Sequence, residues 1–413
     1  MRLNINAASS TWLGLRLLLG ITIAYTWATW QFYTRHDQGG NDFFVHYSLW
    51  RACVRYGLNP YSDEAVYYTQ LDIYGRRALP TEDQNILVYP YYSALLYGPF
   101  IVLDFPVARA IFMTLLQAAL FIGVILTLQL VRWKPPVWLL AGVLAWALLN
   151  YPEARAVLLG QFALLGFGLM AATLYFLKQK HDVAAGLVFT VLTIKPTLIF
   201  LVTPFLLLWA ATRRRWHFII AFLSGTATLS LVSLVALPTW IGDWLNRVFG
   251  YSSYTGGQGL VWLFTHIAAP GLGQIGEWLI DALLIAGMLW AWWRAMRPGP
   301  EAEHEFHWAF GITLVVSNFI IARSATPNYA LMLIPTIWIF AALDRRARRV
   351  GQLIVVGVMG VMLVGHWWLH AATVVGNQEQ AIMFVPWPVL MALALLLGRG
   401  WLIQDSRRAS VTL

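Results

Sequence analysis

Residues 213–237 read RRRWHFIIAFLSGTATLSLVSLVAL, and this stretch decides the fold. From Phe218 to Leu237 it contains no charged residue, and about 20 such residues are the length that an α-helix needs to cross a lipid bilayer. The three arginines directly before it are typical of the cytoplasmic end of a membrane span. The stretch therefore predicts a transmembrane helix together with its orientation.

The composition of the whole chain agrees with this interpretation. Of 413 residues, 59% are hydrophobic and only 11% are charged, which is more apolar than a water-soluble fold of this size. The long apolar runs do not alternate with polar residues, so they favour helices over barrel strands. We predict a polytopic all-α membrane protein with about ten to thirteen transmembrane segments, forming a single membrane domain over residues 1–413 without a separate soluble domain.

The positive charges follow the apolar runs in short clusters. The net charge of +9 might suggest a nucleic-acid partner, but this distribution is typical of the cytoplasmic side of a membrane protein. We therefore predict contact with membrane lipids and no nucleic acid. The clusters are Arg132 and Lys134, Lys178 and Lys180, Arg213 to Arg215, Arg294 and Arg297, Arg345 to Arg349, and Arg407 and Arg408.

This orientation places the longest polar segment, residues 34–90, on the outer side after a first, retained helix at about Trp12 to Tyr33. The stretch 91–103 is too short to cross the membrane, so we expect a half-helix on the outer side. Two further apolar runs, 183–194 and 197–211, are also short, which is typical of helices that line a cavity. The other outward loops are predicted at 151–156, 238–260, 322–328 and 371–384.

Asp42 lies within about ten residues of the end of the first helix, so we expect it at the edge of the membrane. A carboxylate there could act as a general base towards a hydroxyl group. The alternative is an ordinary loop acid or a helix N-cap.

Three basic residues are predicted on the outer side, where basic residues are otherwise few. In order of preference they are Lys195, Arg323 and Arg155. An ionisable residue at membrane depth suggests a functional site. The alternatives are a lysine that extends to the interface, an Arg323 paired with a nearby acid, and an Arg155 neutralised by Glu153.

The order and spacing of several motifs resemble glycosyltransferase family 87 over about the first 220 residues. Asp42-Phe43-Phe44-Val45-His46-Tyr47, followed by Gly57-Leu58-Asn59-Pro60-Tyr61, is similar to the first-loop signature of that family. Gly160-Gln161 and Lys195-Pro196-Thr197 are similar to later landmarks. The family contains membrane mannosyltransferases with the GT-C fold that use polyprenyl-phosphate sugars. Past Leu237 the likeness is one of hydropathy, although Arg323-Ser324-Ala325-Thr326-Pro327-Asn328-Tyr329 lies where the family has a polar outward turn.

The resemblance implies an inverting transfer of a hexose, with mannose as first choice, from a polyprenyl-phosphate donor to a hydroxyl of a glycolipid or glycan. The reaction would take place at the outer face of a plasma membrane, and we expect a bacterial source. Asp42 would be the catalytic base. The leaving phosphate requires cations, for which Lys195, Arg323 and Arg155 are the candidates. Candidate contacts to the sugar or acceptor are Asp37, His46, Tyr47, Tyr61 and Gln161.

Each of these polar residues has a structural alternative. Tyrosines such as Tyr47 and Tyr61 more often pack a loop than stack on a sugar, and Gln161 may instead cap a helix. The histidines do not have the spacing of a metal site, and no phosphate-binding glycine motif occurs. We therefore expect no metal and no cofactor apart from the lipid-linked donor substrate.

Two other classes of membrane protein remain open at this stage. A transporter or lipid flippase would also have many apolar helices with a few buried charges. An O-antigen polymerase or ligase would share the outer-face chemistry, but with its large outward loop late in the chain. The long loop directly after the first helix, the acid at its start and the lack of repeated halves favour the glycosyltransferase.

Overall fold

The structure is a computed structural model that describes residues 5–37, 39–80, 82–255, 259–299, 301–321, 325–376 and 379–403. All regular elements in these ranges are helices, which confirms the prediction of a polytopic all-α membrane protein. The stretch that opens the sequence analysis forms one of them, α11, from Trp216 to Ala236.

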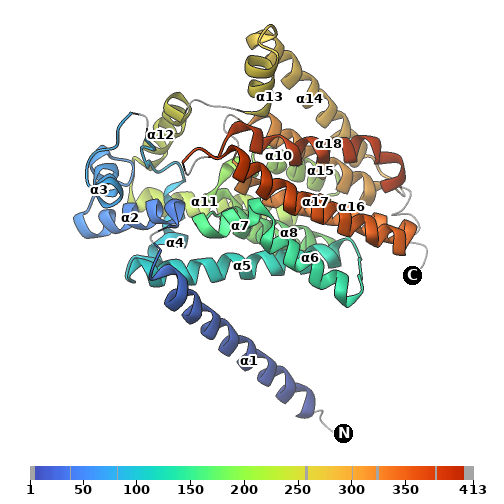
Figure 1. The fold of residues 1–413 in the computed structure, drawn as a ribbon, viewed down its shortest axis with the longest axis horizontal. Helices are drawn as coiled ribbons and strands as arrows, with labels where there is room; N and C mark the ends of the chain where they lie inside the picture. Colours follow the sequence, from blue (N-terminus) through green and yellow to red (C-terminus); the bar gives the residue numbers. More distant parts are fainter. Residues whose placement is uncertain are drawn as a thin grey trace.

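Most elements follow one another with short connections, and the segment between α3 and η2 is the longest connection among the described residues (Figure 1). The α-helices are α1 Ile5–Thr29, α2 Asn41–Tyr56, α3 Asp63–Tyr74, α4 Ala94–Tyr97, α5 Phe105–Leu130, α6 Val137–Leu149, α7 Tyr151–Leu159, α8 Ala163–Lys178, α9 Asp182–Val191, α10 Val202–Thr212, α11 Trp216–Ala236, α12 Trp240–Thr255, α13 Leu260–Leu263, α14 Gly273–Met296, α15 Ala302–Ile320, α16 Leu333–Ala347, α17 Arg349–Thr373 and α18 Pro386–Leu397. The 3-10 and π segments are η1 Trp30–Thr34, η2 Tyr91–Ser93, η3 Gly98–Phe100, η4 Leu192–Ile194, η5 Pro196–Leu198, η6 Phe264–Ala268, η7 Thr326–Met332 and η8 Ala381–Phe384.

Six of the described helices are long and apolar enough to cross a membrane, and the bent pair α6 and α7 makes up to seven. Three shorter apolar helices, at 163–178, 182–194 and 202–212, accompany them. The predicted number of ten to thirteen segments stays a prediction, because it depends on counting the shorter helices as spans. The spans are Phe105–Leu130, Trp216–Ala236, Gly273–Met296, Thr326–Ala347, Arg349–Thr373 and Ala381–Ile403.

The prediction of a loop at residues 151–156 is wrong, because these residues belong to helix α7. Asn150 has an extended backbone, with φ −60° and ψ 138°, and the axis bends there by 53°. Pro152 lies in the first turn of α7, where its missing N–H costs no helical hydrogen bond. The chain therefore bends at Asn150 and continues as a helix, and the turn comes only at residues 160–162.

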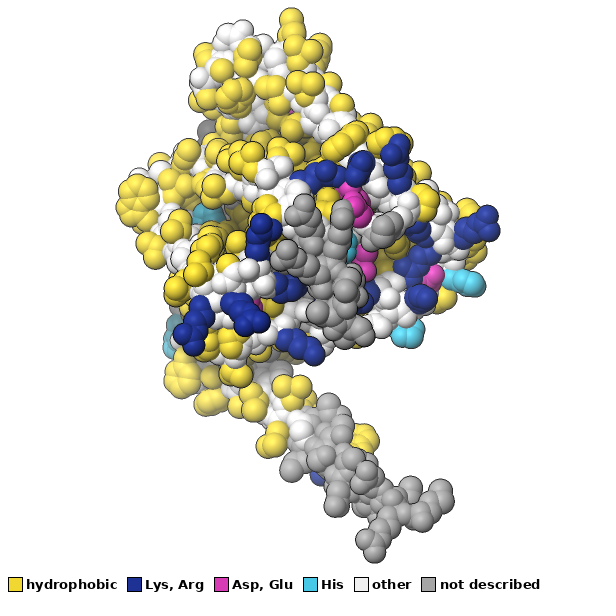
Figure 2. All heavy atoms as spheres, turned by 90° about the vertical axis from the view of Figure 1, so that its right-hand side faces the viewer, with side chains coloured by type: hydrophobic (Ala, Val, Ile, Leu, Met, Phe, Trp, Pro, Cys, Tyr) yellow, Lys and Arg dark blue, Asp and Glu magenta, His cyan; other side chains and the backbone are white. Residues whose placement is uncertain are grey.

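The basic clusters within the described residues and the first loop lie at opposite ends of the helix bundle. At 1.5 Å per residue, the 26 residues of α5 span about 39 Å between these ends. At its first end the Thr34 hydroxyl donates to the Pro106 carbonyl over 2.6 Å. At its far end Arg345 donates to the Val131 carbonyl over 3.2 Å, and Lys178 donates to the Leu130 carbonyl. Figure 2 shows Lys and Arg side chains gathered on the face at this second end, opposite α2 and α3 in Figure 1.

The segment after α1 and η1 is a folded unit. Phe43 of α2 stacks on Phe112 of α5 with ring centroids 4.3 Å apart, and Ser48 of α2 bonds Asp72 of α3 over 2.7 Å. Helix α12 docks on the same unit, since Trp244 donates to the Val88 carbonyl over 2.9 Å. Residues 91–103 form only the short turns η2, α4 and η3, in agreement with the expected half-helix.

Glycines allow two pairs of helices, α5 with α8 and α9 with α11, to pack closely. A Cβ added to Gly168 of α8 would lie 2.7 Å from the Ala119 carbonyl oxygen of α5, and one added to Gly123 would lie 2.5 Å from the Phe167 ring. Likewise, a Cβ on Gly186 of α9 would lie 2.6 Å from the Phe218 carbonyl oxygen of α11. Small residues are the usual means by which membrane helices approach one another. These contacts fix the two short helices α8 and α9 that lead into the site.

We predict that Gly168→Ala lowers the melting temperature of the detergent-purified protein. Overpacking of this kind lowers the free energy of unfolding by about 1–3 kcal/mol. The added methyl group would press on the backbone of α5, which cannot rotate away. Gly287→Ala on α14 is the matched control, because no atom lies within 4 Å of the added Cβ. Equal melting temperatures for the two variants would contradict the close α5–α8 contact.

Candidate functional site

Asp42 lies in the first turn of α2, two residues after the N-cap Gly40, which has a φ of +89°. Asp42 is therefore not the N-cap that the alternative interpretation proposed. A carboxylate in this position is favoured by the positive end of the helix dipole. Its Oδ2 accepts a hydrogen bond from the Nε2 of Gln161.

Gln161 lies in the turn between α7 and α8. Gly160 before it has a φ of +73°, and a Cβ at this glycine would overlap the Cβ of Phe43. The turn therefore rests directly on α2, and this close approach brings the Gln161 side chain to Asp42. The N-cap of α8 is Phe162, so the alternative role of Gln161 as a helix cap does not apply.

Lys195 lies where η4 ends and η5 begins with Pro196. Its ammonium donates to Gln161 Oε1 over 2.8 Å and to Asn328 Oδ1 over 2.8 Å, and only 7% of the residue is exposed. The side chains of Asp42, Gln161, Lys195 and Asn328 thus form one hydrogen-bonded chain. Four segments contribute to it: α2, the α7–α8 turn, the η4–η5 junction and η7.

The surroundings of α2 shift the pKa values of its titratable side chains. Loss of hydration on burial raises the pKa of Asp42, while the Lys195 ammonium and the Gln161 amide act in the opposite direction. Burial, together with the charge of Lys195, lowers the pKa of His46 to about 3. His46 is therefore neutral at physiological pH, and it stacks on Tyr97 with ring centroids 4.1 Å apart. This stacking places His46 in the wall of the site beneath Asp42.

Of the two candidate phosphate ligands among the described residues, Lys195 joins this chain and Arg155 does not. Arg155 forms an ion pair with Glu379, with 3.1 Å between Nε and Oε1, and donates to the Tyr151 hydroxyl over 3.1 Å. The acid that pairs with Arg155 is thus Glu379, whereas Glu153 bonds Asn150 over 2.9 Å. Arg323 lies outside the described residues.

Three of the candidate sugar contacts are engaged within the protein. Asp37 forms an ion pair with Arg109, with 3.0 Å between Oδ2 and Nη1. Tyr47 donates to the Leu103 carbonyl over 2.7 Å, and Tyr61 donates to the Tyr89 carbonyl over 2.8 Å. These contacts agree with the structural alternative for the two tyrosines, so a role in sugar binding stays a prediction that this geometry does not favour.

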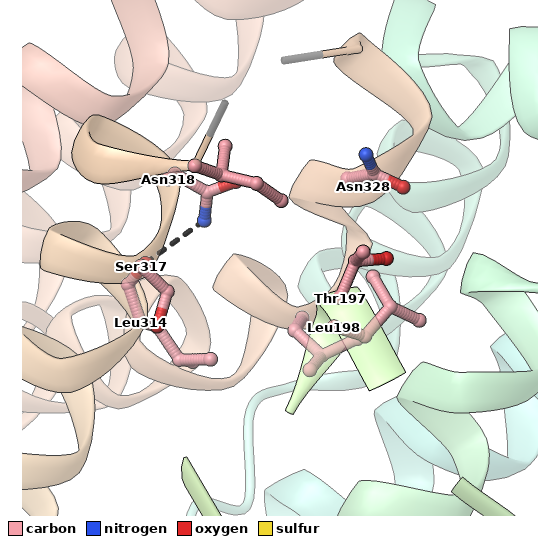
Figure 3. A pocket seen from close by; sticks show the side chains of 8 residues that line it. Thr197, Leu198, Leu314, Ser317, Asn318 and Asn328 are labelled. Atoms are coloured by element: carbon pink, nitrogen blue, oxygen red, sulfur yellow. Dashed lines mark hydrogen bonds between the residues drawn. The ribbon is translucent and has the colours of Figure 1, made fainter. Parts of the chain in front are cut away.

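A pocket lies beside Asn328 (Figure 3). It encloses about 270 Å³, including the part that opens outward, and half of its lining residues carry a hydroxyl or a carboxamide. Ser317 and Asn318 of α15 face Thr197 and Asn328 across it. Asn328 therefore belongs both to the pocket and to the chain that contains Lys195. The lining residues are Thr197, Leu198, Leu314, Ser317, Asn318, Ile321, Asn328 and Leu331.

The sequence analysis did not select Asn328 or the pair Ser317 and Asn318 as site residues. Their signal in the sequence is weak, because Ser317 and Asn318 are two small polar residues near the end of an apolar run and Asn328 is one asparagine in a predicted loop. Within the described ranges, His, Cys, Asp and Glu side chains do not gather in groups of three that could hold a metal ion. Whether the reaction requires a metal stays a separate question of chemistry.

A comparison with protein families supports the family to which the motifs pointed. The model described as Glycosyltransferase family 87 matches residues 87–320, which is more than half of the chain. The matched range includes Gln161 and Lys195, while Asp42 precedes it. No curated protein matches the chain. The family match, together with the helices that can cross a membrane, leads to one conclusion: the chain belongs to glycosyltransferase family 87 and is a multi-pass membrane glycosyltransferase.

Proposed function

We propose that this protein transfers a hexose, with mannose as first choice, from a polyprenyl-phosphate donor to a hydroxyl of a glycolipid or glycan acceptor, with inversion. Asp42 is the general base and Lys195 binds the leaving phosphate. One observation carries the proposal: the Asp42 carboxylate and the buried Lys195 ammonium both bond the carboxamide of Gln161, the carboxylate at its nitrogen and the ammonium at its oxygen.

Asp42 has the properties that a general base needs. Gln161 contacts its Oδ2, so Oδ1 is the oxygen that would accept the proton of the acceptor hydroxyl. The residue is partly exposed, so a substrate can reach it. The protein around it nevertheless removes much of the hydration of the carboxyl group, which raises its pKa. A pKa closer to neutral makes a carboxylate a better proton acceptor at physiological pH.

Lys195 is suited to stabilise a departing lipid phosphate. An ammonium has three N–H donors, and Gln161 and Asn328 accept two of them. A third donor direction remains for a phosphate oxygen. Because the residue is 7% exposed, water screens its charge weakly, and a charge-assisted hydrogen bond to phosphate is stronger there than at the surface.

Gln161 has a defined place in this scheme. A direct ion pair between Asp42 and Lys195 would neutralise both groups and compete with the substrate. The carboxamide instead donates to the carboxylate and accepts from the ammonium, so each charge is oriented without being bound to the other. Both charges remain in place for the acceptor and the donor.

The position of the site supports a reaction at the extracytoplasmic side of the membrane, which we propose to be a bacterial plasma membrane. Asp42 lies at the end of the bundle where α5 begins, and the basic clusters lie where α5 ends (Figures 1 and 2). Since basic clusters usually face the cytoplasm, the site faces outward. A transporter or flippase would instead be expected to hold its polar groups near the membrane midplane.

We predict that the purified protein consumes one member of a panel of polyprenyl-phosphate sugars and transfers its sugar to an acceptor. Asp42→Asn should abolish transfer, because an amide cannot accept the proton, while donor binding persists. The matched control is Asp63→Asn in the same loop, whose side chain is 85% exposed and pairs only at the surface with Arg247. Transfer is measured by chromatography of the labelled sugar product.

Three results would contradict this proposal. Turnover from sugar nucleotides alone would show that the donor class is wrong. Full turnover by Asp42→Asn, with a melting temperature equal to that of the wild type, would exclude Asp42 as the base. Loss of activity in both Asp42→Asn and Asp63→Asn would indicate that the loop has only a structural role.

The pH dependence gives an independent measurement of Asp42. Burial raises the pKa of this carboxyl group, and the base must be ionised, so kcat/KM should fall on acidification at a higher pH than the ordinary pKa of 3.8 for aspartate. The hydrogen bond from Gln161 lowers the pKa of Asp42. Gln161→Leu removes this bond and should therefore move the fall in kcat/KM on acidification to still higher pH. If this fall stays at the same pH or moves to lower pH, Asp42 is not the titrating group.

A further inference from the structure

Arg109 of α5 is a buried charge that neither the family resemblance nor the proposed chemistry explains. Only 2% of the residue is exposed. Its guanidinium donates to the backbone carbonyl of Asp37 over 2.8 Å, to the Asp37 carboxylate over 3.0 Å and to the Tyr33 hydroxyl over 3.3 Å. It also approaches the carbonyl of Leu158 at 3.4 Å. These partners belong to two segments that are far apart in sequence.

The first segment leads into α2. A Cβ added to Gly39 would lie 2.8 Å from the Nη2 of Arg109, and one added to Gly40 would lie 2.7 Å from its Nε. The backbone just before Asp42 therefore lies directly on the guanidinium, with no space for a side chain. Gly40 also has a φ of +89°, a conformation that residues with a Cβ rarely adopt. Arg109 thus forms the surface on which α2 begins.

The second segment is the end of α7. Leu158 lies three residues before Gln161, and Gly160 between them rests on Phe43 of α2. One guanidinium therefore contacts the backbone that precedes the carboxylate and the backbone that precedes the carboxamide. Both segments meet again at the hydrogen bond from Gln161 to Asp42. The contacts of Arg109 with both segments, together with the bond between Gln161 and Asp42, fix the relative position of these two side chains.

We propose that Arg109 is a positioning residue that sets the contact between Asp42 and Gln161 for sugar transfer. The inference rests on the proposed function for its kinetic consequence. Arginine suits this position because its planar group carries five donors in fixed directions, so it can bond both segments at once. A lysine would keep the charge next to Asp37 but could not span the two segments.

The kinetic test compares Arg109→Lys with the wild type in the donor assay. We expect kcat to fall by about 10- to 100-fold, the usual effect of displacing a reacting group by about 1 Å, while KM for the donor stays within about twofold. The matched control is Arg132→Gln, which removes an exposed arginine that follows the other end of α5. It should leave kcat and KM unchanged. An unchanged kcat for Arg109→Lys would overturn the proposal.

A second measurement does not depend on activity. In a Cys53→Ser background, which removes the single cysteine, Asp42→Cys and Gln161→Cys create a pair for a short thiol cross-linker. We expect cross-linking to slow at least several-fold when Arg109→Lys is added, and to stay unchanged when Arg132→Gln is added. Equal rates in all three proteins would show that Arg109 does not position this pair.

The two measurements separate the inference from the proposed function. If the wild type uses a donor other than a polyprenyl-phosphate sugar, the proposed donor class fails, while a slower cross-link in Arg109→Lys still supports positioning. If Arg109→Lys does not fold, Asp37→Asn removes the half-exposed ionic partner and should produce the same changes in smaller degree. Normal kinetics and normal cross-linking in Asp37→Asn would then overturn the inference.

Discussion

The site depends on one physical constraint, which is that the charge of Lys195 must be kept hydrogen-bonded while it is almost excluded from water. A buried ammonium is strongly destabilising unless polar groups surround it. Here two carboxamide oxygens, from Gln161 and Asn328, supply these contacts at 2.8 Å each. Both hydrogen-bond partners are neutral and the Asp42 carboxylate acts on the ammonium only through space, so the ammonium can still attract an anion.

The irregular backbone around the site follows from this constraint. A continuous helix uses its own polar groups, whereas three segments here interrupt their helices where they meet Lys195. The α7–α8 turn carries Gln161, the η4–η5 junction carries Lys195 itself, and the 3-10 segment η7 carries Asn328. Irregular backbone at membrane depth is tolerated only where protein or an internal cavity surrounds it. The short lengths of α8, α9 and α10 are therefore the consequence of a site built between them.

The sequence allowed the fold class and part of this site to be predicted. Charge-free runs of helical length identify spans without knowledge of their neighbours, and Asp42, Gln161 and Lys195 were selected from motifs in a recognisable order. The remaining partners could not be selected in this way. Asn328 bonds a residue 133 positions away, and Arg109 lies within an apolar run in which a single arginine gives no hint of what it contacts. The wrong loop at 151–156 has a similar cause, because this interval between two apolar runs was assigned to a loop, whereas the chain turns only at Gly160.

The orientation of the Gln161 carboxamide also bears on the end of the reaction cycle. Its nitrogen faces the negative group and its oxygen faces the positive group, so it is held in place only while both charges persist. In the proposed transfer, Asp42 gains a proton in the same step in which Lys195 gains a phosphate. Protonation of Asp42 weakens the bond from the carboxamide nitrogen, whereas the phosphate takes the third donor of Lys195 and leaves the bond to the carboxamide oxygen in place. The completed reaction therefore loosens Gln161 on the acceptor side only, and loss of the proton from Asp42 restores its orientation for the next turnover.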